Sequence, residues 1–261
     1  MQTNIEIEKI DNQTWRISEI DKATELAVDA YLICGATRSV LIDTLFYTSN
    51  LYDVVRTLTS LPLDIILTHG HIDHVGVSLP TFAAEGCTVY MNIRDLPLIE
   101  STRPMFLNIV QFTDLQDGQP FSLGGRELEI IMVEGHTPGS LVVLNRAAQL
   151  AFTGDTIGSG EFWMQLPEAF PLRVFKNSLQ SFYDDIKGLH NLQIYPGHKA
   201  QSPTQLTKGY IEDTLTITEA LLSGAMNGEE QHMFFAGHEI DYKQVSHGAM
   251  RCYCYDPEKI Q

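Results

Sequence analysis

The stretch THGHIDHVG at positions 68–76 places three histidines and one aspartate within six consecutive positions. The chain has nine histidines in 261 residues, so a third of them stand in this one segment. The apolar run LDIILT directly precedes the first histidine and predicts a short buried strand. The two-residue step between His69 and His71 lets both side chains leave one face of an extended segment. The pattern therefore predicts a metal site where this strand ends.

Three further apolar runs end in the same way. LEIIMVEGH ends at His136, LAFTGD ends at Asp155 and LQIYPGH ends at His198, each with a glycine just before the polar residue. In open α/β folds, functional groups gather beyond the carboxyl ends of the strands. Together the four segments supply five imidazoles and two carboxylates, which exceeds one tetrahedral zinc site and suits two ions that share a bridging ligand. The candidate ligands are His69, His71, Asp73, His74, His136, Asp155 and His198.

The composition limits the classes of function. Hydrophobic residues make up 44% and charged residues 19% of the chain, as in ordinary globular proteins. A net charge of −16 argues against a nucleic-acid-binding protein, which needs a basic surface. We see no signal peptide and no apolar run of the ~20 residues that span a bilayer. Four scattered cysteines do not form a disulfide framework, so we expect reduced thiols and a cytoplasmic protein. We expect a small-molecule substrate, no nucleic-acid or membrane partner, and a homodimer as the possible assembly.

Strand-like and helix-like segments are mixed along the whole chain, which predicts one α/β domain over residues 1–261. Short strands are expected at 4–10, 14–18, 29–34, 39–44, 63–68, 87–91, 128–134, 141–145, 150–154 and 192–196. Helices are expected at 49–61, 175–189 and 204–224, and two or three short strands follow position 231.

At this point the sequence resembles the metallo-β-lactamase-fold hydrolase superfamily, in its glyoxalase II-like branch. The resemblance rests on LIDT with Asp43, THGHIDH, EGHTPGS, FTGDT and YPGH, which run in family order over residues 43–198. It implies an αββα sandwich of two mixed sheets flanked by helices. The helix and strands from about position 200 onward would complete the second half of that sandwich.

The resemblance also implies roles for individual residues. His69, His71 and His136 would hold a first metal, Asp73, His74 and His198 a second, and Asp155 would bridge the two. Asp43 would orient the ligands from outside. We expect two Zn²⁺ per chain, with iron or manganese as the other candidates. Asp73 would also act in catalysis, because it would stand between the second metal and the nucleophile and relay its proton.

These roles predict a dinuclear hydrolase that uses a metal-bridging hydroxide on a small thioester, ester or lactone. Gly158 stands where related lactonases carry a tyrosine, which weakens the lactone alternative. A mononuclear iron dioxygenase of the persulfide dioxygenase type is the first rival, because imidazole and carboxylate ligands suit iron as well as zinc. A phosphodiesterase is the second rival, and the acidic composition counts against it.

The segment 156–175, TIGSGEFWMQLPEAFPLRVF, is unusually aromatic and apolar for the loop that we expect there. Together with two aromatic residues just beyond Asp43, this segment could line a substrate pocket. The candidate pocket residues are Phe46, Tyr47, Phe162, Trp163 and Met164. The alternative is that these side chains pack against the sandwich or a neighbouring subunit.

Overall fold

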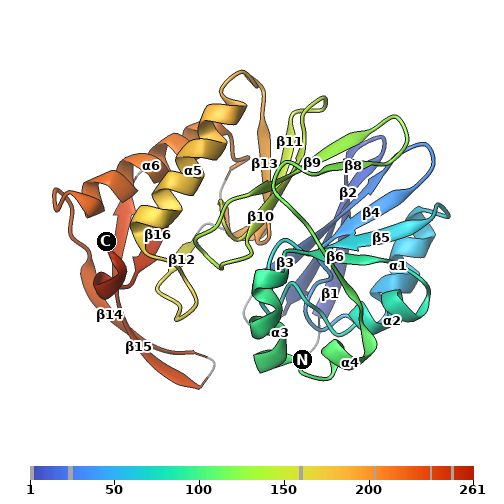
Figure 1. The fold of residues 1–261 in the computed structure, drawn as a ribbon, viewed down its shortest axis with the longest axis horizontal. Coiled ribbons are helices and arrows are strands. Elements are labelled where there is room, and N and C mark those ends of the chain that lie inside the picture. Colours follow the sequence, from blue (N-terminus) through green and yellow to red (C-terminus); the bar gives the residue numbers. More distant parts are fainter. Residues whose placement is uncertain (1–2, 23–25, 159–160, 203, 236, 248–249) are drawn as a thin grey trace.

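Two mixed sheets face each other, and helices cover their outer sides (Figure 1). The structure, a computed structural model, describes residues 3–22, 26–158, 161–202, 204–235, 237–247 and 250–261. The first sheet has the order β1-β2-β3-β4-β5-β6-β7, antiparallel as far as β4 and parallel beyond it. Its strands are β1 (Thr3–Asp11), β2 (Thr14–Asp21), β3 (Ala27–Cys34), β4 (Ser39–Ile42), β5 (Leu63–Ile66), β6 (Val89–Met91) and β7 (Phe112–Asp114).

The second sheet has the order β13-β11-β10-β9-β8. Its strands are β8 (Pro120–Ser122), β9 (Glu127–Met132), β10 (Leu141–Asn145), β11 (Leu150–Gly154) and β13 (Gln193–Pro196). β10 lies antiparallel between β9 and β11, and β13 pairs in parallel with β11. Strands β9, β11 and β13 therefore run in one direction, and their carboxyl ends meet at one edge of the sheet.

The layers are held together by apolar side chains on both faces of each sheet. Tyr31 and Ile66 from the first sheet pack against Leu141 and Phe152 from the second, and all four are fully buried. The outer face of the first sheet packs against α1 (Leu51–Leu58), α2 (Leu79–Ala84), α3 (Leu96–Thr102) and α4 (Phe106–Ile109). The outer face of the second packs against α5 (Leu172–Ile186) and α6 (Lys208–Leu222). The predicted αββα sandwich is confirmed.

A third sheet was not predicted. Its order is β12-β16-β15-β14, built from β12 (Glu161–Met164), β14 (Glu229–Phe235), β15 (His238–His247) and β16 (Met250–Tyr255). The expected loop at 156–175 thus contains a strand, and that strand pairs in parallel with β16 from the end of the described chain. The C-terminal strands accordingly form their own sheet and add no strand to the second one.

The helices differ from the predicted ranges at their ends. The helix expected at 204–224 begins only at Lys208, because Leu206 first forms a backbone bridge with Ile194 of β13. The helix expected at 175–189 begins three residues earlier, directly after Pro171, whose fixed φ suits a helix start. None of the helices in the described residues is both long and apolar enough to cross a bilayer.

Candidate metal centre

The predicted ligands lie just beyond the carboxyl ends of four strands. His69 and His71 follow β5, His136 follows β9, Asp155 directly follows β11, and His198 follows β13. Since β9, β11 and β13 end at one sheet edge, and β5 belongs to the facing sheet, the four chain segments converge where the sheets meet. The structure places all seven predicted side chains in two groups there: His69, His71 and His136 in one, and Asp73, His74, Asp155 and His198 in the other.

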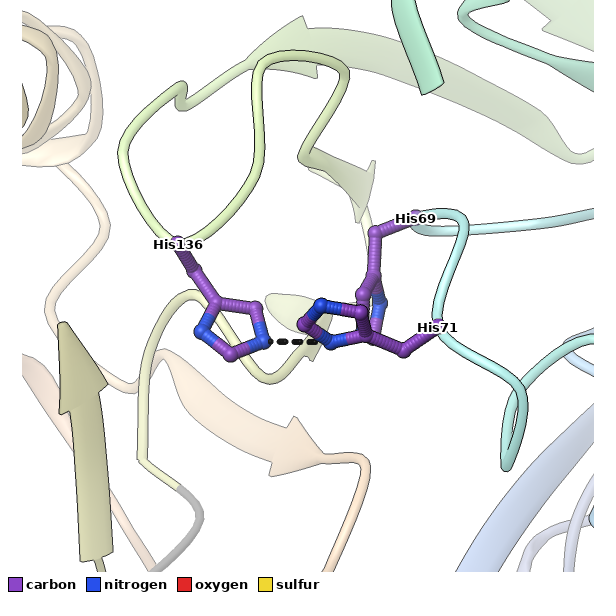
Figure 2. A group of neighbouring side chains, drawn as sticks. All are labelled: His69, His71 and His136. Atoms are coloured by element: carbon purple, nitrogen blue, oxygen red, sulfur yellow. Dashed lines mark hydrogen bonds between the residues drawn. The ribbon is translucent and has the colours of Figure 1, made fainter. Parts of the chain in front are cut away.

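Three imidazole nitrogens converge in the first group (Figure 2). Nδ1 of His71 lies 3.1 Å from Nε2 of His69 and 3.0 Å from Nε2 of His136. Ligand nitrogens around a tetrahedral zinc stand about 3.3 Å apart, given Zn–N bonds of roughly 2.0–2.1 Å. The spacing of the three nitrogens is therefore close to that of three ligands on one ion.

The outer nitrogens of the same rings fix where the protons lie. Nδ1 of His136 donates to the carbonyl oxygen of Trp163 at 2.8 Å, and Nε2 of His71 donates to Oε1 of Glu168 at 2.5 Å. Neither acceptor has a proton to give, so the inner nitrogen of each neutral ring carries a lone pair. The two inner nitrogens therefore cannot donate to each other in the neutral state. Converging lone pairs of this kind fit a shared cation.

The second group contains two imidazoles and two carboxylates. Nε2 of His198 lies 3.2 Å from Oδ2 of Asp155 and 3.4 Å from Oδ2 of Asp73. Nε2 of His74 lies 3.3 Å from Oδ1 of Asp155. That nitrogen and that oxygen are both buried and make no hydrogen bond with the described part of the chain. Buried polar atoms are rarely left unpaired, so this pair also fits an ion.

Asp155 lies between the two groups. Its Oδ2 is 3.9 Å from Nε2 of His136 in the first group and 3.2 Å from Nε2 of His198 in the second. The position agrees with the bridging role that the resemblance implies.

Asp43 contacts the second group directly, at His74, and the first group through Thr68, which contacts His69. Its carboxylate accepts hydrogen bonds from the backbone N–H and the hydroxyl of Thr68 and from Nδ1 of His74, all at 2.8 Å. The Thr68 hydroxyl in turn lies 3.1 Å from Nδ1 of His69. Asp43 has a left-handed φ of 60°, an uncommon conformation for a residue with a side chain. The position of Asp43 agrees with the orienting role that the resemblance implies.

The backbone at Gly197 comes unusually close to the ligands. A Cβ atom at this position would lie 2.4 Å from Cε1 of His74 and 2.5 Å from Oδ1 of Asp155. Only glycine leaves these two side chains in place, which explains the glycine directly before His198.

Two of the three imidazoles in the first group favour the neutral form. Burial lowers the pKa of His69 well below its ordinary value, and neighbouring His74 and His71 lower it further. Burial, with His71 beside it, lowers the pKa of His136 to about 4. Since a histidine binds a metal through its neutral form, these two rings are ready to act as ligands at neutral pH.

The second group favours ionised carboxylates. Burial alone would raise the pKa of Asp155, but His198 and His74 beside it hold that pKa well below the ordinary value. Asp73 has the same balance, with His74 and His198 lowering the pKa of its carboxyl. Both acids are therefore anionic and available to a cation.

Two supporting carboxylates were not predicted. Glu168 accepts the hydrogen bond from His71, and buried Asp95 accepts from the backbone N–H groups of Gly70 and Gly139 at 2.8 and 2.6 Å. Asp95 thereby ties the loop that bears the first two histidines to the loop that bears His136. Neither acid belongs to a local motif, so only the folded chain shows their proximity to the ligands.

Replacing Glu168 by alanine is expected to weaken metal binding by about 10- to 100-fold, the usual cost of removing a partner of a ligating histidine. Burial alone would lower the pKa of His71, but Glu168 raises it. This carboxylate therefore makes the imidazole a stronger electron-pair donor to a metal ion. Glu168→Gln should cost less, because its amide oxygen still accepts. Competition with a chromophoric chelator measures the affinity. Glu134→Ala, which removes an acid paired with Arg94, is the matched control, and equal affinities in the Glu168 and Glu134 variants would contradict the role.

The predicted pocket residues separate into different environments. Phe162 and Met164 are 1% exposed and pack in the core with α5 and α6, so the prediction that they line a pocket is wrong. Strand alternation explains this, because neighbouring Trp163 points to the other face of β12. Trp163 lines a pocket of about 250 Å³ on the third sheet, together with Glu161, Gln165, Met233, Tyr242, Gln244 and Cys254. Phe46 and Tyr47 stack on each other with ring centroids 3.8 Å apart, and Tyr47 is exposed.

Comparison with known proteins supports this architecture. The family model of the metallo-beta-lactamase superfamily matches residues 23–198, which include all seven ligand candidates. The hydroxyacylglutathione hydrolase GloC of Haemophilus influenzae is 34% identical over 37% of this chain and 50% of its own length. The probable polyketide biosynthesis zinc-dependent hydrolase BaeB of Bacillus velezensis is 25% identical over 58% of this chain and 63% of its own length. The chain thus spans about half to two thirds of the length of these curated relatives.

A solved structure shares the fold over most of the described chain. TTHA1623, determined in a di-iron-bound form, is 28% identical and superposes with a TM-score of 0.59 over 72% of this chain and 94% of its own. The family match covers more than half of the sequence and contains every motif that carries the resemblance. This chain therefore belongs to the metallo-beta-lactamase superfamily.

Proposed function

We propose that the protein is a dinuclear metal-dependent hydrolase that cleaves a small thioester, ester or lactone. The observation that carries the proposal is the position of Asp155, whose carboxylate lies between a group of three histidines and a group of two histidines and an aspartate. Zinc is the ion that we expect at both places, with iron or manganese as the other candidates.

Different residues of the chain would hold the two ions. His69, His71 and His136 would hold one ion, and Asp73, His74 and His198 the other, with Asp155 shared between them. Two such ions, when bound, would lower the pKa of a coordinated water toward about 7 and would polarise the carbonyl oxygen of the substrate.

Asp73 is the residue that we assign to proton transfer. Its side chain is 27% exposed, twice as much as the 13% of Asp155, so it is the more accessible of the two carboxylates. Because it is anionic, it is able to accept a proton from the nucleophile and hold it on its carboxylate until the leaving group takes it.

The relatives support hydrolysis over the rival functions. Two of them are hydrolases by name, and one is named as zinc-dependent. A mononuclear iron dioxygenase would need only two histidines of the first group and Asp155, and would leave Asp73, His74 and His198 without a role. The di-iron-bound form of TTHA1623 supports iron as an alternative metal. The cytoplasmic location and the homodimer stay predictions.

Metal analysis and a substrate panel test the proposal together. Elemental analysis of protein purified without added metal should give about two zinc ions per chain. Chelation should then abolish the hydrolysis of model thioesters, aryl esters and lactones, and added Zn²⁺ should restore it. A single iron per chain with oxygen uptake on a persulfide would overturn the proposal in favour of the dioxygenase. Cleavage of a model phosphodiester alone would favour the phosphodiesterase.

A further inference from the structure

Arg103 places a positive charge beside the candidate metal centre. It stands directly after α3, and its Nη2 lies 3.5 Å from the carbonyl oxygen of Ile72. Ile72 is the residue between His71, in the first ligand group, and Asp73, in the second. The guanidinium therefore touches the backbone of the segment that joins the two groups.

Aromatic rings flank this guanidinium. Its Cζ lies 5.9 Å from the ring centroid of Phe46 and 5.3 Å from that of Phe106, which are distances at which a cation is attracted to an aromatic face. Phe46 stacks on Tyr47, and the carboxylate of Glu19 accepts hydrogen bonds from the backbone N–H of Tyr47 and of the next residue. These contacts hold the loop that contains Phe46 and Tyr47 in place, and the Phe46 ring of that loop in turn holds the charge of Arg103 in position.

Arg103 has no acidic partner within 4.0 Å in the described parts of the chain, although the sequence has 33 acidic and only 17 basic residues. Five other arginines do pair with acids at that distance: Arg16, Arg38, Arg94, Arg126 and Arg146. The Nε atom of Arg103 is buried and makes no hydrogen bond with the described residues. Of the five N–H donors of this guanidinium, one makes a long backbone contact.

We propose that Arg103 binds an anionic group, a carboxylate or a phosphate, on the part of the substrate that is not cleaved. The inference rests on the proposed hydrolase function and adds the charge of its substrate. A guanidinium binds either anion through two parallel N–H···O bonds, and partial removal from water strengthens such bonds. An unpaired arginine at this position also offsets the repulsion that a chain of net charge −16 exerts on an anion.

A matched pair of esters tests the proposal. 4-Acetoxybenzoate and its neutral amide, 4-acetoxybenzamide, differ in charge and share the same reacting acetyl group, and 4-acetoxyphenyl phosphate is the phosphate arm. In the wild type, kcat/KM should be higher for an anionic ester than for the amide. Arg103→Gln should lower that ratio by about 10- to 100-fold, mainly through KM, as expected for the loss of charged hydrogen bonds. Arg103→Lys should restore part of the ratio, because the charge returns without the bidentate geometry.

The matched control is Arg56→Gln. Arg56 on α1 also lies over an aromatic ring, that of Tyr52, and donates to the carbonyl oxygen of Leu61, so it has a similar environment in another part of the fold. This control should leave the ratio unchanged. An equal fall for the anionic and neutral esters in Arg103→Gln would show a purely structural role and overturn the proposal, as would an unchanged ratio.

Calorimetry separates this inference from the hydrolase function. Binding of 4-hydroxybenzoate, 4-hydroxyphenyl phosphate and 4-hydroxybenzamide needs no turnover, and the tighter of the two anions identifies the preferred group. Anion binding that depends on Arg103 without any ester hydrolysis would refute the hydrolase and keep the anion site. Hydrolysis without charge preference, or the absence of anion binding, would refute the anion site.

Discussion

Replacing Asp155 by alanine is expected to abolish turnover and to reduce the bound metal from about two ions per chain to one at most. The carboxylate is the contact between the two ligand groups, 3.9 Å from Nε2 of His136 and 3.2 Å from Nε2 of His198. Loss of an outer partner of a ligand already costs 10- to 100-fold in affinity or activity, so removal of the shared ligand itself should cost more than about 100-fold. The remaining ion should occupy the three-histidine group.

Elemental analysis and the rate of ester hydrolysis measure the two effects in the same sample. Asp185→Ala, which removes an exposed acid of α5 that pairs with Arg146, is the control and should retain wild-type metal and rate. Asp155→Ala also removes the buried Oδ1 atom that lies 3.3 Å from the buried Nε2 of His74. Two ions per chain and a wild-type rate in Asp155→Ala would refute the bridging role.

The ligand set was predictable because its chemistry is rare and local. Histidines are few in this chain, and each candidate follows an apolar run that predicts a buried strand. The structure brings all seven into two groups because β9, β11 and β13 end at one edge of the second sheet and the segment after β5 of the facing sheet converges with them there. Spacing alone did not assign the ligands to one ion or the other; only the resemblance implied that division, and the geometry groups them in the same way, with Asp155 facing both groups.

The supporting acids and the pocket were less predictable, for two physical reasons. Glu168 and Asp95 are two of the 33 acidic residues. Glu168 is important because it contacts His71, which lies 97 positions away in the sequence, and Asp95 because it contacts Gly139, which lies 44 positions away. No local pattern reports such an approach. The pocket error had no clear local signal, because EFWM at 161–164 is one acidic residue followed by three hydrophobic ones, and only their burial in the folded chain alternates. The partner strand β16 lies far along the chain, so the sequence around 161–164 does not show the pairing.

Replacing Asp73 by alanine is expected to lower kcat by about 10²- to 10⁴-fold, the range that a positioned proton acceptor contributes. The residue touches the second group from its accessible side, with Oδ2 3.4 Å from Nε2 of His198 and 3.8 Å from Nε2 of His74. Asp155 and the two histidines remain in the variant, so we expect metal content to fall only in part. Loss of rate beyond loss of metal is the signature of a catalytic role.

The comparison with Asp155→Ala makes this prediction specific. Both variants remove one carboxylate from the same group, but only Asp155 also faces His136. Asp73→Ala saturated with Zn²⁺ should therefore regain most of its second ion and little of its rate, whereas Asp155→Ala should regain neither. Asp73→Asn keeps the shape of the side chain and removes its basicity, so it should be as slow as the alanine variant if proton transfer is the role. A wild-type kcat in zinc-saturated Asp73→Asn would limit Asp73 to metal binding and leave the proton to another group.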